Sequence, residues 1–494
     1  MGIIQRQGIK NTIITYTGIG IGFLNILFFQ PRFLTPQEVG LTRILFNFSS
    51  LVSFLLPLGI GVITVKYFSY FRNEKNGHNG FFGLILLFMF VGFIFVSILL
   101  LLFKGFIFSQ YEKESKLFTE YYYCVFPLSL VLSFIAVLTL YCNSIFKTTF
   151  PALFNEVLIR ILSIVLFAVY FLKWISLSVF MWLFVSVYGT QVIFLLTYIA
   201  IVGNPSLKIN WKIFETHHPK EMIGYGLLLT FSAVAALGIK FLDSLVIGHY
   251  YNLSFVGIYT IAAFIPTVLE APLNALERIT NTKIAHSLAT HDYGEVKKIY
   301  YQSVKYLLLV GGLLFVGIVT NIEFLIKFLP ADYSKGLEVV YIISIGTLCT
   351  IAGGSNTSII LNSDNYKKGA ALMIGLVFVT FALNVLLIPK FGINGAAAAT
   401  ALSAFFYSSL KFAIVYRQFK FQPYNSSTLK IALLVVTCLL LNYFLPHFKS
   451  PMLNIIFRAL VFGGIYVSGI ILLNVERELP KRILNFNFKQ LKAW

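Results

Sequence analysis

Apolar runs of about 20 residues, repeated along the whole chain, constrain the fold of this protein more than any other feature of its sequence. A helix made from such a run matches the roughly 30 Å hydrocarbon core of a bilayer. Within a bilayer the backbone must satisfy its own hydrogen bonds, and these runs lack the alternation of a membrane barrel. The sequence therefore predicts an all-α, polytopic membrane protein.

The runs predict about fourteen transmembrane helices. They lie approximately at 8–30, 41–63, 81–103, 120–142, 150–171, 176–201, 222–248, 254–276, 301–320, 336–362, 368–388, 394–416, 430–446 and 452–474. The composition agrees with this, because 58% of the 494 residues are hydrophobic and only 12% are charged. In soluble proteins about a quarter of all residues are charged.

The net charge of +19 could indicate a nucleic-acid partner, so the placement of the basic residues is decisive. With a cytoplasmic N-terminus, the cytoplasmic segments hold twenty-three Lys and Arg when Lys10, Lys368 and Lys430 at the adjoining span ends are included, and the outer segments hold nine. This bias follows the positive-inside rule, and an even number of spans places both termini in the cytoplasm. The basic tail is expected to bind anionic membrane lipids. No soluble segment is large enough for a nucleic-acid interface, so we expect no nucleic-acid partner.

A hinge between apolar runs occurs twice. FQPRFLTPQEVGLTRIL at 29–45 aligns with VIGHYYNLSFVGIYTIA at 246–262, so that Gly40 overlies Gly257. A second pair, LYCNSIFKTTFPAL and IILNSDNYKKGAAL, follows with nearly the same offset. Two distant matches at nearly equal offsets predict an internal duplication.

Six spans separate the two copies, so both copies enter the membrane in the same direction. We expect two parallel six-helix lobes related by an axis along the membrane normal, which is a plan for alternating access. The predicted parts are an N-lobe at 1–205, a cytoplasmic linker at 206–221 and a C-lobe at 222–417. Two last helices and the basic cytoplasmic tail occupy 418–494.

Three segments carry a family resemblance: FLTPQEVGL, LPLGIGVITVKYFSYFR and FLPADYSKGLEVV. With the span count and the repeat, they resemble Wzx-type polysaccharide and O-antigen flippases. That family belongs to the multidrug/oligosaccharidyl-lipid/polysaccharide exporter superfamily, whose fold is that of the MATE antiporters. The resemblance implies a flippase for undecaprenyl-diphosphate-linked oligosaccharide, the repeat unit of O-antigen, capsule or exopolysaccharide. It places the protein in the bacterial cytoplasmic (inner) membrane, with a polysaccharide polymerase and chain-length proteins as further candidate partners.

Basic residues within the spans are the candidate cargo-binding groups. A charge inside a span costs about 2.5–3.5 kcal/mol on the insertion scale, so it usually faces an interior. Arg160, Arg43 and Lys240 are therefore predicted to hold the diphosphate in a wet cavity. Three further bases lie near span ends, where their long side chains are expected to reach the interface: Lys305, Lys411 and Arg458.

Acids in the same spans leave an alternative open. Glu156 lies four residues before Arg160 and Asp243 three after Lys240, so both could form intrahelical ion pairs that only stabilise the fold. Glu270 has no evident partner in the sequence. It could bind a coupling proton or a cation such as sodium, or a bend at Pro266 and Pro272 could draw it to the inner surface. No catalytic set, metal site or other cofactor is expected.

Two other transporter functions and one enzyme class are alternatives. A MATE-type drug or cation antiporter would share the fold. The resemblance implies that such an antiporter relies on an acidic residue in its first helix, whereas the first span here carries Asn25 and no acid. A lipid II flippase also has fourteen spans and a cationic cavity. A membrane glycosyltransferase or polymerase would need catalytic acids or a large outer loop, so we expect no enzyme. The glycines of TGIGIGF at 17–23 predict close helix packing instead of a nucleotide loop.

Overall fold

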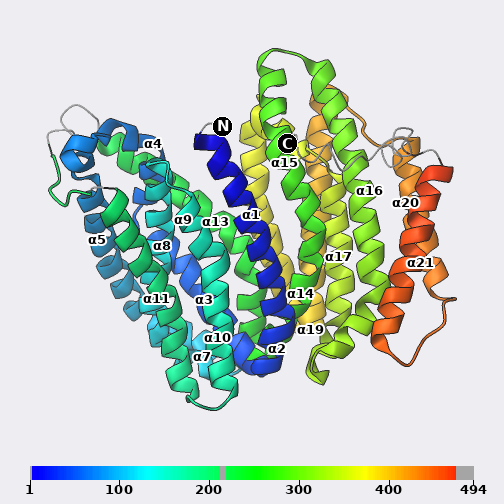
Figure 1. Ribbon diagram of the computed structural model, residues 1–494, viewed down its shortest axis with the longest axis horizontal. Coiled ribbons are helices and arrows are strands. Elements are labelled where there is room, and N and C mark those ends of the chain that lie inside the picture. Colours follow the sequence, from blue (N-terminus) through cyan, green and yellow to red (C-terminus); the bar gives the residue numbers. More distant parts are fainter. Residues whose placement is uncertain (1–2, 204, 212–218, 474, 476–494) are drawn as a thin grey trace. The chain divides into compact units, whose positions relative to one another are not determined.

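Helices make up all the regular structure of the part of the chain described here, residues 3–203, 205–211, 219–473 and 475 of a computed structural model. The all-α prediction is confirmed. The basic tail lies outside the described residues. The chain divides into two compact units, Met1–Ile261 and Ala262–Trp494, which are shown in Figure 1. Each unit is described by itself.

The first unit contains the helices α1 to α13 and most of α14, many of which are labelled in Figure 1. Its elements are α1 (Ile3–Leu24), the π-helix η1 (Asn25–Phe29), α2 (Gln30–Phe33), α3 (Pro36–Leu55), α4 (Ile60–Phe71), η2 (Glu74–Gly80), α5 (Phe81–Leu102), α6 (Lys104–Tyr111), α7 (Lys116–Glu120), η3 (Tyr122–Cys124), α8 (Val125–Ser144), α9 (Thr149–Leu153), the π-helix η4 (Phe154–Leu158), α10 (Ile159–Phe171), α11 (Leu177–Val202), α13 (Pro219–Tyr250) and α14 (Leu253–Phe264). The boundary between the units falls within α14.

A break between α3 and α4 bends the second predicted span by 52°. α3 begins at a capping box, in which Thr35 and Glu38 bond each other's backbone N–H groups. It ends before LPLGIG, where Leu58 and Gly59 have φ angles of +48° and +90°. Gly92 of α5 lies directly against this break, and a Cβ there would overlap the carbonyl of Leu56. The bend therefore depends on local backbone conformation and on a glycine contact.

The two hinge glycines that the sequence repeat aligns lie against each other in this unit. A Cβ on Gly40 would overlap the carbonyl of Leu253, and a Cβ on Gly257 would overlap that of Pro36. Each added Cβ would also lie 3.1 Å from the backbone nitrogen of the other glycine. Pro36 and Leu253 each stand four residues before a hinge glycine, so the contact is reciprocal.

Residues 205–211 lie across the start of α5. The backbone N–H of Ser206 donates to Gly77 at 3.3 Å, and that of Asn210 donates to Asn79 at 3.1 Å. Cβ atoms on Gly80 or Gly83 would overlap the backbone of this segment. These glycines therefore permit a close backbone contact, which no pattern in the sequence predicts.

The second unit continues with helices that run through the remaining predicted spans. Its elements are η5 (Ile265–Leu269), α15 (Glu270–Ala289), α16 (Tyr293–Leu325), η6 (Ile326–Phe328), η7 (Ala331–Gly336), α17 (Leu337–Ala352), α18 (Asn356–Asn362), α19 (Tyr366–Phe419), α20 (Ser426–Asn442) and α21 (Pro451–Leu472). Within α19, Gly392 has φ 59° and ψ −137°, a conformation that only glycine adopts readily. The kink separates the predicted spans 368–388 and 394–416.

The described residues of all fourteen predicted ranges lie mostly on these helices, but the number of membrane spans stays a prediction. Among the described residues, ten helices are long and apolar enough to cross a membrane, and the bent pair of α3 and α4 adds an eleventh. The division into lobes also stays a prediction. α13 packs against α3 and α4 in the first compact unit, whereas the repeat assigns its residues to the second lobe.

Two basic residues of the second unit were expected at the interface, and this expectation was wrong. Arg458 is 1% exposed and Lys411 is 6% exposed. Arg458 donates to the carbonyls of Asn442 and Pro446, each at 3.4 Å, and to the Asn442 side chain. Lys411 donates to Thr357 at 3.1 Å. Their hydrogen bonds compensate the burial that the span boundaries alone did not reveal.

Candidate functional site

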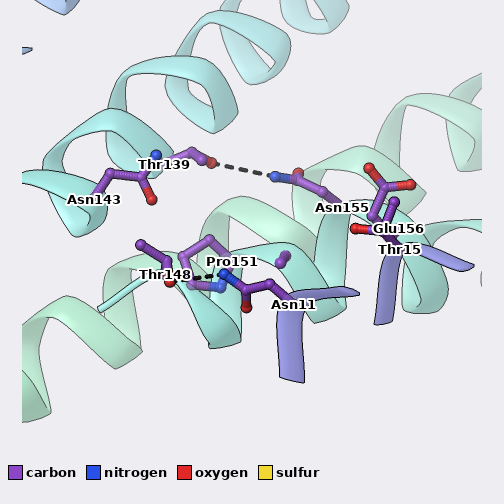
Figure 2. A pocket seen from close by; sticks show the side chains of 9 residues that line it. Asn11, Thr15, Thr139, Asn143, Thr148, Pro151, Asn155 and Glu156 are labelled. Atoms are coloured by element: carbon purple, nitrogen blue, oxygen red, sulfur yellow. Dashed lines mark hydrogen bonds between the residues drawn. The ribbon is translucent and has the colours of Figure 1, made fainter. Parts of the chain in front are cut away.

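A polar cavity of about 350 Å³ lies within the first unit (Figure 2). We call it the amide pocket. It is lined by Asn11, Thr15, Thr139, Asn143, Thr148, Pro151, Ala152, Asn155 and Glu156. These residues come from α1, α8, α9 and η4 and from the turn before α9. The volume falls at the lower end of the range of small-molecule sites.

Hydrogen bonds hold the amide side chains in place. Asn11 Nδ2 donates to Thr148 Oγ1 at 2.9 Å, and Asn155 Nδ2 donates to Thr139 Oγ1 at 3.5 Å (Figure 2). Gln191 of α11 donates its amide to Asn155 Oδ1 from behind. The Oδ1 atom of Asn11 is buried and accepts no hydrogen bond from the described residues. The pocket thus keeps at least one acceptor for a ligand.

The π-helix η4 places two pocket residues, Asn155 and Glu156. A π-turn inserts one residue into a helix and rotates the side chains around it, and such turns are frequent at functional sites. In Figure 2, Glu156 and Thr15 lie at one side of the pocket and Asn143 at the other. The lining therefore combines amides and hydroxyls, which both donate and accept, with a single carboxylate.

Arg160 lies one turn beyond the pocket and pairs with Glu156. Its Nη2 atom is 2.9 Å from Glu156 Oε2, and both side chains are about one-third exposed. Its Nη1 atom donates to the carbonyl of Gly18 in α1. A Cβ on Gly22 would lie 2.5 Å from Nη1, and a Cβ on Gly18 would lie 2.6 Å from the carbonyl oxygen of Glu156. The glycines of TGIGIGF thus permit close packing of α1 on this ion pair, as predicted.

The other two predicted cations lie apart from this pair. Arg43 stands on α3, within electrostatic range of Tyr188 of α11. Its Nε atom is buried and has no hydrogen-bond partner among the described residues. Lys240 lies on α13 and is exposed. No contact that brings Arg160, Arg43 and Lys240 into one cluster is found in the described part of the chain.

The remaining predicted acids are placed differently from one another. Asp243 is 8% exposed and accepts a hydrogen bond from Tyr259 of α14. Glu270 is exposed and begins α15, directly after the 3₁₀ segment η5 that contains Pro266. Ion coupling by either residue stays a prediction. Among the described residues, no three His, Cys, Asp or Glu side chains form a candidate metal site.

The amides of the pocket are not among the predicted site residues, because those residues are the charged groups of the spans. Asn11, Asn155 and Gln191 are uncharged, but an amide in an apolar helix also needs a partner. An amide within an apolar run is therefore a sequence signal for a buried polar contact. Asn143 did appear as a landmark of the repeat, without an assigned role.

A family profile matches enough of this chain to establish its family. The profile of the family described as polysaccharide biosynthesis protein matches residues 31–336, more than half of the chain. The chain belongs to this polysaccharide biosynthesis family. Family membership confirms the resemblance to polysaccharide flippases of the exporter superfamily.

A curated relative is the probable flippase AglR of Haloferax volcanii. It is 27% identical to this chain over 172 residues, which are 33% of this chain and 35% of the relative. The match therefore spans about a third of the length of that protein. It agrees with a flippase in the polysaccharide biosynthesis family.

Solved structures share the fold over almost the whole chain. The lipid II flippase MurJ, in an inward closed conformation, has a TM-score of 0.71 at 14% identity, covering 96% of this chain and 99% of its own. An inward-facing multidrug resistance transporter of the MATE family has a TM-score of 0.64 at 12% identity, covering 83% of this chain and 98% of its own. At such identities the likeness establishes a common fold.

Proposed function

We propose that this protein flips an undecaprenyl-diphosphate-linked oligosaccharide across a bacterial cytoplasmic membrane by alternating access. The amide pocket is the observation that carries the proposal. Sugar hydroxyls both donate and accept hydrogen bonds, and the pocket offers amides and hydroxyls of both kinds. Family membership supports the same cargo class.

Arg160 is the proposed contact for the diphosphate when the carrier crosses the membrane, with Arg43 and Lys240 as further cations. A guanidinium can donate two parallel hydrogen bonds to phosphate oxygens. In this conformation Arg160 already donates to Glu156 and Gly18. The proposal therefore requires Arg160 to exchange these partners for phosphate during the transport cycle.

A cation antiporter is the second candidate, because a carboxylate, Glu156, lines the pocket. Arg160 neutralises that carboxylate here, which favours a neutral or anionic ligand. A lipid II flippase would present the same chemistry as the first proposal, since both cargoes are sugars on a lipid diphosphate.

Depletion of the protein in its host tests the cargo. We expect lipid-linked oligosaccharide to accumulate in the inner leaflet, and mass analysis of that species distinguishes a polysaccharide repeat unit from a peptidoglycan precursor. Efflux of cationic dyes should not change. Loss of dye efflux without lipid accumulation would favour the antiporter.

Pocket variants connect the phenotype to the site. Thr139→Val and Asn155→Leu remove hydrogen-bonding groups and should reduce export while the protein still inserts. Thr197→Val is the matched control, since Thr197 is an exposed hydroxyl of α11 that bonds its own helix at Ile193. Equal export by all three variants would contradict a role for the amide pocket.

A further inference from the structure

A second cavity adjoins the amide pocket and differs from it in chemistry. It has a volume of about 420 Å³ and is called the Arg72 pocket here. It is lined by Val65, Phe68, Arg72, Leu140, Asn143, Ser144 and Phe146. Asn143 lines both cavities. Asn143 therefore connects the polar amide pocket with a second cavity. That cavity is apolar except for the guanidinium of Arg72 and the side chains of Asn143 and Ser144.

Arg72 lies over an aromatic ring that also lines this cavity. Its guanidinium carbon lies 4.7 Å from the centroid of the Phe146 ring. Arg72 is exposed, and so are Val65 and Phe146 beside it. A cation between exposed apolar side chains fits a ligand that joins an anionic group to a hydrocarbon chain.

The backbone at Phe146 has a conformation that usually selects glycine. Phe146 has φ +60°. Its N–H donates to Asn143, and that of Lys147 donates to Cys142, which is the pattern of a helix end where glycine is favoured. Lys173 and His291 occupy the same position after α10 and α15 with polar side chains. An aromatic residue in a left-handed conformation is costly, and such residues concentrate at functional sites.

We propose that the two cavities form one binding site for the head of a phosphate-linked glycolipid. The sugar occupies the amide pocket, a phosphate binds Arg72, and the start of the hydrocarbon chain lies against Val65 and Phe146. Asn143 lies where sugar and phosphate join. This inference rests on the proposed function and adds a loading subsite to it.

The chain places this site at one end of the first unit. Asn11 lies in the first half of α1, Arg72 follows the last residue of α4, and Asn143 lies in the last turn of α8. In the predicted topology these three positions share the cytoplasmic side of the membrane. Arg72 would then capture the cargo from the inner leaflet, before Arg160 contacts the diphosphate within the membrane.

Binding to the purified full-length protein in lipid nanodiscs tests this site. The probes are farnesyl diphosphate, the same molecule carrying N-acetylglucosamine, and dioleoyl phosphatidylglycerol. The variants are Arg72→Gln, Asn143→Leu and the control Lys147→Gln, which removes an exposed charge that lines neither cavity. Thermal unfolding of each variant confirms that it is folded.

We expect wild type to bind the glycosylated probe more tightly than farnesyl diphosphate. Arg72→Gln should weaken both by about tenfold or more, because charge-assisted hydrogen bonds are lost. Asn143→Leu should remove only the advantage given by the sugar, and Lys147→Gln should change neither affinity. A sugar that adds nothing to wild-type affinity, or equal losses from Lys147→Gln and Arg72→Gln, would overturn the site.

The outcomes also separate this inference from the proposed function. Phosphatidylglycerol binding that matches the glycosylated probe and depends equally on Arg72 would make the cavity a site for resident anionic lipid and overturn the inference. A wild-type protein that binds neither isoprenoid probe would contradict both proposals. Tight binding of the glycosylated probe that ignores Arg72 and Asn143 would remove only the loading site.

Phe146→Gly separates binding from folding. Glycine suits the backbone at this position, so the thermal unfolding midpoint should stay or rise, while affinity for both isoprenoid probes falls severalfold. A variant that unfolds more readily and binds both probes as wild type does would make the ring a structural group and remove it from the site.

Discussion

Gly40 and Gly257 pack backbone to backbone. A side chain on either residue would overlap backbone atoms of the other helix. The contact is reciprocal, because each hinge glycine faces the carbonyl of the residue four positions before the other. The sequence repeat aligns the same two glycines, 217 positions apart in the chain. A local two-fold relation between the two hinges is what a duplicated hinge predicts.

Alanine at either hinge should weaken the first unit. In Gly40→Ala and Gly257→Ala the new Cβ overlaps a backbone carbonyl that cannot rotate away, so we expect a loss of about 1–3 kcal/mol or more. The midpoint of thermal unfolding in detergent measures it. Gly189→Ala is the control, since a Cβ there meets nothing within 4 Å. Equal midpoints for all three variants would contradict the contact.

Neutralising Arg160 and Glu156 separately and together distinguishes cargo binding from pairing. Arg160→Ala should abolish export, Arg160→Lys should keep part of it, and Glu156→Gln should retain most of it. If Arg160 binds phosphate, the double neutral variant inserts normally but does not export polysaccharide. Recovery of export in that variant would reduce the pair to a folding role.

Moving Arg160 without changing its charge gives a second view of the same group. Gly22→Ala would place a Cβ 2.5 Å from Nη1, so the flexible side chain must shift while the helix remains intact. We expect reduced export at normal protein level. Gly20→Ala meets nothing within 4 Å and should export as wild type. Normal export by Gly22→Ala would mean that the position of Arg160 is not critical.

Arg458 should prove essential for the last two helices. Arg458→Met leaves the carbonyls of Asn442 and Pro446 without their buried donor and removes the cation from the Phe324 ring, 4.9 Å away. We expect a loss of about 1–3 kcal/mol, because buried acceptors lose their hydrogen-bond donor. Thermal unfolding measures it, with Lys449→Gln in the exposed loop as control. Similar unfolding midpoints would assign Arg458 no structural role.

Reporter fusions test the predicted topology directly. Fusions after Lys75 and Lys208 should report cytoplasm, and fusions after Lys113 and Lys449 should report the outer side, as the basic-residue bias requires. The same experiment with a fusion after Lys492 locates the C-terminus. An inverted signal at Lys75 or Lys113 would overturn the lobe assignment.

Local features of this protein were predictable from its sequence, whereas contacts between segments that are distant in the sequence were not. Apolar runs gave the helices, and the spacing of Glu156 and Arg160 gave their pairing as an alternative, because both depend on a single helical period. The carbonyl of Gly18 on Arg160 and the amide of Gln191 on Asn155 depend on tertiary packing. The burial of Arg458 was missed for the same reason, since its partners lie on another helix and its following loop.

The segment 205–211 across the start of α5 affects the order in which contacts can form while the chain is being synthesised. A ribosome that has reached Trp211 has already made both sides of this contact, Gly77–Gly83 and the segment that covers it. The loop between the second and third spans can therefore be closed while later helices are still untranslated. The Gly40–Gly257 contact must wait for some fifty further residues, so the first hinge enters the membrane without its counterpart.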